Sequence, residues 1–285
     1  MKRLLFFALF LLAGCSTSFY YLGSSWEREL PDNLDLGMPC QADQVVNRQG
    51  YAVGYSQYLK QPLWVTYRLT KDEAESKLVK RTNDFRSDPG IVGGSANPED
   101  YIRSGYDRGH LAPAADMHWS TNVMSESFFM SNMSPQTPGL NRNTWACAEE
   151  FTRDVAIREG SVFVVSGPVV TNQAPRVIGR NKVVVPDAFY KVIYDETPPE
   201  KMIAFVMPND NPNADMWLYA TNVVCVEELT GMVFFPVLEL EKHLLKMQVN
   251  TNEWISINEK DSSTSLTNGV TTVTGGDGGI SQSGE

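Results

Sequence analysis

Short runs of β-branched, aliphatic and aromatic residues, separated by turn-forming residues, are the main pattern in the first half of the chain. Residues 50–56 and 62–69 are two such runs, and the turn around Lys60 and Gln61 predicts that they form neighbouring strands. Residues 71–80 are charged, with interspersed alanine and leucine, and predict a short helix. A sheet hairpin followed by a helix is therefore expected near the start of the folded part.

A longer helix is predicted over residues 143–158, after a stretch rich in proline and glycine and before a further glycine. Asn141 or Asn143 is expected to cap its N-terminus. Because each residue turns a helix by about 100°, Glu149 and Arg153 share one face, with Asn141 at the N-terminal edge of that face. The pattern therefore predicts that these polar side chains lie along one edge.

Several apolar runs follow this helix. Residues 161–168 form a continuous apolar run, which is typical of a buried central strand. Similar runs follow at residues 183–186, 189–194 and 202–207. Their spacing predicts an α+β fold, with a mixed, mostly antiparallel sheet flanked by helices.

The N-terminus has the pattern of a targeting segment. Lys2 and Arg3 precede an apolar run over residues 4–12, which is shorter than the roughly 20 residues needed to span a bilayer. The run ends in Leu-Ala-Gly-Cys and resembles a bacterial lipobox. Residues 1–14 are then a lipoprotein signal peptide, and Cys15 is the lipidated residue. The alternative is an ordinary signal peptide with an incidental cysteine.

The segments outside the central domain differ from it in composition. Residues 15–48 show no clear period and are interpreted as the lipidated cysteine and a tether, whereas residues 258–285 are rich in Ser, Thr and Gly and are predicted to be disordered. Residues 49–257 remain as one domain. Ser16 after the cysteine favours anchoring in the outer membrane of a bacterial cell envelope, with the domain facing either the periplasm or the outside.

Composition allows one well-buried domain, since 42% of the 285 residues are hydrophobic and 11% are aromatic. The formal net charge is −10 and becomes more negative when Lys2 and Arg3 are removed with the signal peptide. Proteins that bind nucleic acids usually show a basic face. The charge therefore counts modestly against a polyanionic substrate, although positive charge is needed only where phosphate binds.

Residues 106–110 and 140–149 combine a histidine, asparagines and arginines. His110 can act as a base, because neutral imidazole accepts a proton near pH ~7. An asparagine oxygen suits a hard cation, and arginines suit phosphate. Such a set predicts cleavage of phosphodiester bonds. Asp107 is expected to fix local structure by hydrogen bonds, and Gly109 to permit tight backbone geometry.

The order of these motifs resembles a known family. Asp-Arg-Gly-His at residues 107–110 is followed by Ser-Asn-Met-Ser-Pro-Gln at 131–136 and Leu-Asn-Arg-Asn-Thr-Trp at 140–145, and then by Glu149 and Arg153. Together they resemble the DNA/RNA non-specific endonucleases of the ββα-metal (His-Me finger) type, which include endonuclease G. The resemblance spans roughly residues 50–240.

The resemblance implies a role for each site residue. Asn141 would be the only direct protein ligand of Mg²⁺, for which Mn²⁺ can substitute, and Glu149 would hold waters around the ion. Arg108 and Arg153 would contact phosphate. An arginine-bearing loop also contributes to the family's cleft, and here either Arg81 or Arg86 would reach a phosphate. The sequence departs from one branch of the pattern at Asn83, where a second arginine can stand.

Simpler interpretations exist for each residue taken alone. Asn141 could be only a helix cap, Glu149 and Arg153 only an exposed pair, and Arg81 and Arg86 only solvated surface charges. The joint occurrence of the motifs in this order favours the site.

The sequence therefore predicts a metal-dependent endonuclease that acts on DNA and RNA with little sequence preference, with catalytic residues His110, Arg108 and Glu149. One alternative is a catalytically silent envelope module that binds nucleic acid. Another is a phosphodiesterase for small substrates. A homodimer and a restraining inhibitor protein are further partners that the sequence leaves open.

The remaining histidines and cysteines receive no catalytic role. His118 follows the motif loop but is expected to be structural, and His243 is assigned no role. Beyond Cys15, the chain has Cys40, Cys147 and Cys225, an odd number that allows one disulfide with a spare thiol.

Overall fold

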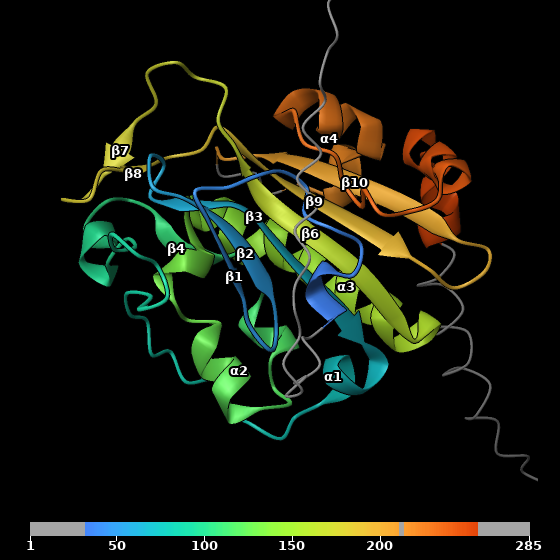
Figure 1. Ribbon diagram of the computed structural model, residues 1–285, viewed down its shortest axis with the longest axis horizontal. Helices are drawn as coiled ribbons and strands as arrows, with labels where there is room; N and C mark the ends of the chain where they lie inside the picture. The colour runs from blue at the N-terminus through green and yellow to red at the C-terminus, as the bar shows by residue number, and fades with distance from the viewer. Residues whose placement is uncertain (1–31, 211–213, 256–285) are drawn as a thin grey trace, which may run out of the picture. The chain divides into compact units, whose positions relative to one another are not determined.

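The computed structural model describes residues 32–210 and 214–255. A seven-stranded sheet with the order β1-β2-β3-β6-β9-β10-β11 runs through this part of the chain (Figure 1). Every neighbouring pair in it is antiparallel. Its strands are β1 (Gln44–Asn47), β2 (Ala52–Ser56), β3 (Gln61–Thr70), β6 (Ser161–Val169), β9 (Ala188–Asp195), β10 (Lys201–Pro208) and β11 (Ala220–Thr221).

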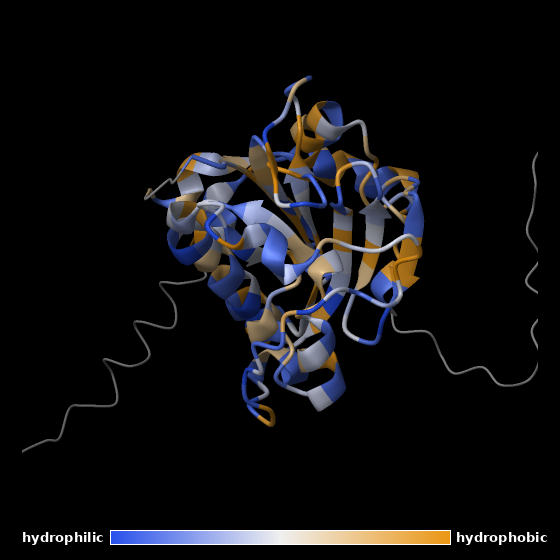
Figure 2. Cartoon of the chain, turned by 90° about the vertical axis from the view of Figure 1, so that its left-hand side faces the viewer, coloured by the Kyte–Doolittle hydropathy of each residue, from blue (hydrophilic) through white to orange (hydrophobic). Residues whose placement is uncertain are grey.

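The sheet is covered on both faces, which explains its continuous apolar strands. Val164 and Val165 are neighbours on β6 but belong to different hydrophobic clusters, because successive side chains of a strand point to opposite faces. One face packs against α3 (Trp145–Glu159), and the other packs against α4 (Val223–Thr230) (Figure 1). In Figure 2 much of the hydrophobic colour lies on the sheet and the segments packed on it. The predicted α+β architecture is confirmed.

A second, two-stranded sheet lies next to the first and carries the motif residues. Strand β4 (Asp107–His110) pairs antiparallel with β5 (Met133–Gln136), and the chain then enters α3 through a π-helical turn, Leu140–Thr144. Along the chain, the short helix α2 (Thr121–Glu126) lies between β4 and β5. The order strand, strand, helix is the predicted ββα core.

The long helix begins differently from the prediction. The π-helical turn precedes α3, and neither Asn141 nor Asn143 caps the helix with its side chain. Instead, the backbone N–H of Asn141 donates to the carbonyl of Thr137 at 2.9 Å, so Asn141 already lies inside the helical ladder. Its amide is therefore available for other contacts. Gly160, with φ +97°, ends the helix as expected.

The helix predicted over residues 71–80 is shorter than expected. Helix α1 (Lys71–Glu75) begins at a capping box between Thr70 and Glu73 and ends at Ser76, which is extended. None of its residues is buried, so no apolar face stabilises further turns.

Two other expectations need correction. The run at residues 183–186 is not a strand of the main sheet: β8 (Val183–Val184) pairs only with β7 (Val177–Ile178) in a separate hairpin. The segment assigned to a tether contains β1, so the ordered domain begins before residue 49.

The predicted signal peptide, Cys15, residues 16–31 and the predicted tail lie outside the described residues. No helix among residues 32–210 and 214–255 is long and apolar enough to cross a membrane.

Candidate active site

The motif strand β4 is held close to β5, and this fixes the position of His110. Gly109 is opposite Ser134 in the register, and a Cβ atom built on Gly109 would lie 2.1 Å from Oε1 of Gln136. No larger residue fits there without movement. His110 pairs with Met133, and its carbonyl accepts a hydrogen bond of 3.3 Å from Nε1 of Trp145 on α3. The histidine is thereby fixed to both strands and to the helix.

The His110 ring lies in an apolar and positively charged environment. Its ring centroid is 5.6 Å from that of Phe85 and 5.0 Å from that of Phe128, and its Nε2 atom has no hydrogen-bond partner. Burial, together with the positive charges of Arg81 and Arg108, lowers the pKa of His110 to about 3. The imidazole is therefore neutral at neutral pH and keeps one nitrogen free to accept a proton.

Asn141 is oriented by Asp107. Its Nδ2 atom donates to Oδ2 of Asp107 at 3.0 Å, and no hydrogen bond of the described residues uses its Oδ1 atom. Arg142 holds the same carboxylate with two hydrogen bonds of 2.8 Å. Although burial opposes it, these contacts with Arg142 and Asn141 keep the pKa of Asp107 below its usual value. Asp107 thus fixes local structure as expected, by directing the amide oxygen of Asn141.

Glu149 lies with His110 and Asn141 around one hollow. This hollow has a volume of about 320 Å³ and is called here the catalytic pocket. It is lined by Arg81, Phe85, Asp107, Arg108, His110, Pro113, Ala114, Ala115, Asn141 and Glu149. Tertiary structure therefore brings together the predicted base, the predicted metal ligand and two of the predicted arginines.

The predicted phosphate-binding arginines separate into two groups. Arg81 and Arg108 line the catalytic pocket, and each guanidinium lies over a phenylalanine ring, at 4.9 Å from Phe128 and 4.1 Å from Phe85. Neither makes an ion pair among the described residues. Asn83, with φ +58°, helps to hold Arg81 in place, because it accepts a hydrogen bond of 2.8 Å from Nε of Arg81.

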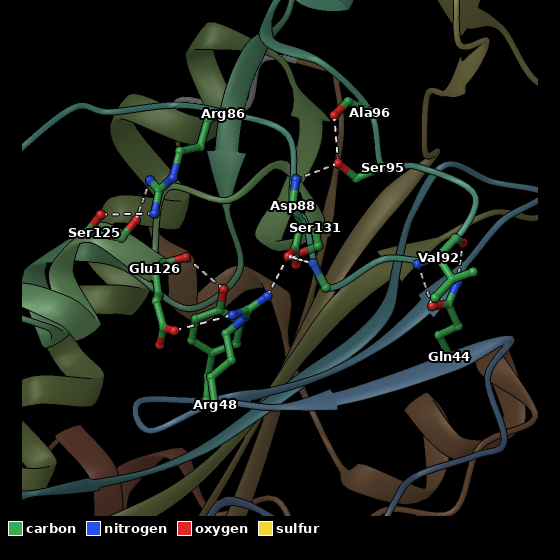
Figure 3. A network of polar contacts seen from close by, with 12 residues as sticks. Gln44, Arg48, Arg86, Asp88, Val92, Ser95, Ala96, Ser125, Glu126 and Ser131 are labelled. Carbon is green, nitrogen blue, oxygen red and sulfur yellow. Dashed lines mark hydrogen bonds and ion pairs between the residues drawn. The ribbon is translucent and has the colours of Figure 1, made fainter.

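Arg86 and Arg153 lie outside the catalytic pocket. Arg86 is paired with Asp84 at 2.8 Å. It also donates to the carbonyl and the hydroxyl of Ser125, both at 2.9 Å (Figure 3). Arg153 donates to the buried carboxylate of Asp116 at 3.0 Å. The geometry gives both residues structural partners and does not bring them to the position expected for phosphate contact.

A buried cation behind the pocket has no counterpart in the sequence prediction. Lys191 on β9 is fully buried, donates to Oγ of Ser166 at 3.0 Å and lies 4.7 Å from the ring centroid of Trp145. Burial raises the pKa of Glu149, and the positive charge of Lys191 opposes that rise. Lys191 therefore favours the ionised form of Glu149. A lysine inside an apolar strand was the only signal in the sequence.

The residues around the catalytic pocket fit a hydrated divalent cation. Asn141 offers a free amide oxygen and Glu149 a carboxylate, and oxygen donors of this kind suit Mg²⁺, which retains most of its waters. No group of three or more His, Cys, Asp and Glu residues within the described ranges could hold a metal. Asp107, Asn141 and Glu149 are the side chains with oxygen donors that line the catalytic pocket.

The other histidines and the cysteines remain outside the site. The Nδ1 atom of His118 contacts the carbonyl of Val79, and Nε2 of His243 lies 3.1 Å from the carbonyl of Leu238. The contact of His118 agrees with its expected structural role. Cys40, Cys147 and Cys225 are free thiols.

Comparison with known proteins agrees with this arrangement. A family model described as DNA/RNA non-specific endonuclease matches residues 31–240. The chain is 33% identical to the mitochondrial nuclease EXOG of Xenopus laevis over 226 residues, or 74% of this chain and 63% of that protein. It is 32% identical to human mitochondrial endonuclease G, with 70% and 72% covered. It thus spans less than two thirds of the length of the first of these relatives.

One solved structure is similar to this chain in both fold and sequence. It is titled as the crystal structure of the EndoG/EndoGI complex and a mechanism of EndoG inhibition, and it matches with a TM-score of 0.68 and 31% identity. The match covers 73% of this chain and 91% of that one. Because the family model covers most of the chain, and the relatives and this structure agree with it, the chain belongs to the DNA/RNA non-specific endonuclease family.

Proposed function

We propose that this protein is a metal-dependent nuclease that hydrolyses phosphodiester bonds in DNA and RNA with little sequence preference. The observation that carries the proposal is the unpartnered Nε2 atom of His110, which is buried in the catalytic pocket beside two unpaired arginines. Burying a polar atom without a partner is costly, so such an atom points to function. The family description, DNA/RNA non-specific endonuclease, supports the substrate class.

His110 acts as the general base. Its neutral ring accepts a proton from the water that attacks phosphorus, and positioned proton transfer of this kind contributes about 10²- to 10⁴-fold to a rate. The surrounding rings of Phe85 and Phe128 keep the imidazole in one orientation. The hydrogen bond from Trp145 to the backbone carbonyl of His110 fixes the backbone that carries the imidazole.

Arg81 and Arg108 bind the negative oxygens of the scissile phosphate. They lie on the same hollow as His110 and make no ion pair among the described residues, so both guanidinium groups can bind the oxygens of a phosphate. Asn141 and Glu149 would hold Mg²⁺ or Mn²⁺. Such an ion would stabilise the charge that develops on the leaving 3′ oxygen. Asp107 holds the Asn141 amide through its Nδ2 atom, which would leave the amide oxygen free to bind the ion.

Digestion of plasmid DNA and of total RNA tests the proposal. A chain that starts at Ser16 should degrade both substrates with Mg²⁺ and neither with a chelator. His110→Ala should lose activity by about 10³-fold while it keeps its thermal stability and its binding of nucleic acid. If the variant retains more than a few per cent of the activity, His110 is not the base.

Two other results would indicate the alternative functions. Binding without cleavage, with either Mg²⁺ or Mn²⁺, would indicate a silent nucleic-acid-binding module. Hydrolysis of a model diester, with plasmid and RNA left intact, would indicate a phosphodiesterase for small substrates.

We further propose that the protein is lipid-anchored through Cys15 in a bacterial envelope, most consistently in the outer membrane. The apolar run at residues 4–12 and the Leu-Ala-Gly-Cys sequence support this assignment. Labelled palmitate should be incorporated into the protein, and Cys15→Ser should abolish the labelling. Equal labelling of both forms would remove Cys15 from this role.

A further inference from the structure

The arginines that make no ion pair lie at only two places among the described residues. Arg48, Arg68, Arg86, Arg142, Arg153 and Arg158 are each paired with a carboxylate. The arginines of the described ranges without such a partner are Arg81, Arg103, Arg108, Arg176 and Arg180. Arg81 and Arg108 line the catalytic pocket, and the other three line one further hollow. In a chain with a net charge of −10, this distribution marks a place for phosphate.

The second hollow is the larger of the two, with a volume of about 810 Å³, and is called here the arginine groove. It lies between the loop after Pro98 and the β7–β8 hairpin, at the end of the molecule that faces the viewer in Figure 2. Its walls are tied together, because Asn181 donates to Asp100 through both its backbone N–H, at 3.1 Å, and its side chain, at 2.7 Å. Asp100 is buried by this contact, so Glu99 is the exposed acid of the groove.

A small hollow connects the arginine groove with the catalytic pocket. It shares Asp107 and Arg108 with the catalytic pocket and Ile102 with the groove. Tyr106 lines this connection, and the guanidinium of Arg176 lies over its ring at 5.2 Å from the centroid. The three hollows therefore adjoin one another, and together they are called here the track, with His110 in the hollow at one end.

The track alternates positive charge with exposed apolar surface. Ile102 is 67% exposed and Val177 is 45% exposed, and both lie beside unpaired arginines. Backbone phosphates suit the arginines, whereas aromatic and aliphatic side chains suit unstacked bases. A duplex presents its phosphates but keeps its bases stacked inside. The mixture of surfaces thus fits a single strand.

We propose that the track binds the single-stranded continuation of the polynucleotide that is cut in the catalytic pocket. Arg103, Arg176 and Arg180 hold its phosphates, and the stacked pair of Tyr106 and Arg176 supports a base that lies beyond the two nucleotides joined by the scissile phosphate. This inference rests on the proposed function, and it adds a preference for long single-stranded segments over short substrates and blunt duplexes.

The first test compares substrates of different length. The second-order rate constant for cleavage should be measured with a dinucleotide, with a single strand of about 16 nucleotides and with a blunt duplex of the same length. Tyr106→Ala should lower the value for the long single strand about ten-fold, since stacking of one base contributes a factor of this order to binding. It should leave the dinucleotide value within about two-fold. Tyr106→Phe keeps the ring and should retain the wild-type value.

The second test uses charge-matched double variants. Arg103→Gln with Arg180→Gln removes two charges from the groove, and Lys71→Gln with Lys77→Gln removes two exposed charges near α1. Binding of the long single strand is measured against salt concentration in a His110→Ala background, so that no cleavage is needed. The groove variant should reduce the salt slope by about 1.4, at about 0.7 per phosphate contact. The lysine variant should not change the slope.

Several outcomes would overturn the inference. If both charge variants reduce the salt slope equally, the effect comes from the net charge of the protein and not from the groove. Equal loss for duplex and single strand would remove the single-strand preference. A change from dimer to monomer with an unchanged salt slope would assign the groove to a second copy of the chain. If the wild type cleaves nothing, the proposed function fails, but the binding experiment still decides whether the track exists.

Discussion

Two arginine-rich regions of this molecule use the same side chain in opposite ways. In the catalytic pocket, Arg81 and Arg108 make no ion pair among the described residues. The Nε2 atom of the neighbouring His110 has no hydrogen-bond partner. In the region drawn in Figure 3, Arg48 is paired with two acids, and Arg86 is bonded to an acid, a hydroxyl and carbonyls. We call this second region the paired network.

The two regions are in direct contact, so the difference does not come from distance. Arg48 and Arg86 both lie over the ring of Phe129, and the neighbouring Phe128 contacts His110 and Arg81. Arg48 and Arg86 therefore hold the segment at Phe128 and Phe129, against which Arg81 and His110 pack. The paired network thus stabilises the wall of the pocket, and the pocket leaves charge free for substrate. Variants in the two regions should separate stability from activity.

The largest expected effect is on stability, at Arg48. Its side chain lies 2.5 Å from Oδ1 of Asp88, whose side chain is fully buried. Arg48→Met leaves that carboxylate buried with its charge uncompensated, which costs about 3 kcal/mol of the free energy of unfolding. Urea denaturation measures the loss, and activity per folded molecule should stay within about two-fold. Adding Asp88→Asn should restore part of the stability; no recovery would contradict the pairing argument.

The next effect is on metal dependence, at Asp107. Asp107→Ala frees the Asn141 amide to rotate, and loss of such an orienting contact typically weakens metal affinity about 10- to 100-fold. A titration of activity with Mg²⁺ should show this shift in the half-saturating concentration. Asp84→Ala, which also removes a carboxylate paired with an arginine, is the control and should leave the titration unchanged. Equal shifts in both variants would remove the special role of Asp107.

The third effect is a dependence of stability on pH. Because the pKa of His110 is about 3 in the folded protein and about 6.5 when unfolded, the unfolded state binds more protons between these values. Folding stability from this group is complete above pH ~6.5 and falls as pH falls toward ~3. At pH 5 the loss is about 2 kcal/mol. His110→Ala should lack this loss, and parallel pH profiles of unfolding for both proteins would contradict it.

The smallest effect is expected at Arg86. Its pair with Asp84 is more than a third exposed, and such pairs contribute at most about 1 kcal/mol. Arg86→Met should therefore leave kcat/KM within about two-fold, although the sequence also made Arg86 a candidate for phosphate binding. Arg81→Met removes the same charge from the pocket and should lower kcat/KM about ten-fold. If both variants lose activity equally, the distinction between paired and free arginines fails.

The sequence by itself determined the core of the site and the class of the fold. Asp107, Gly109 and His110 lie on one short strand, and Asn141 and Glu149 belong to one continuous helical segment, so their geometry is set by local backbone periods. The apolar runs likewise fixed the central strands, since the requirement to bury both faces leaves few other arrangements. The π-helical turn at Leu140–Thr144 escaped prediction, because no local signal separates it from an ordinary helix start.

Tertiary structure alone decided which charged groups are free. Arg48 finds Asp88, Arg153 finds Asp116, and Arg176 finds Tyr106, each across a separation of 37 to 70 residues. Ion pairs and cation–π contacts depend on distances of a few ångströms, and the hydrophobic pattern sets which elements meet but not which charges face each other. For the same reason, the family resemblance made Arg153, and either Arg81 or Arg86, a phosphate contact, whereas the folded chain gives Arg86 and Arg153 protein partners.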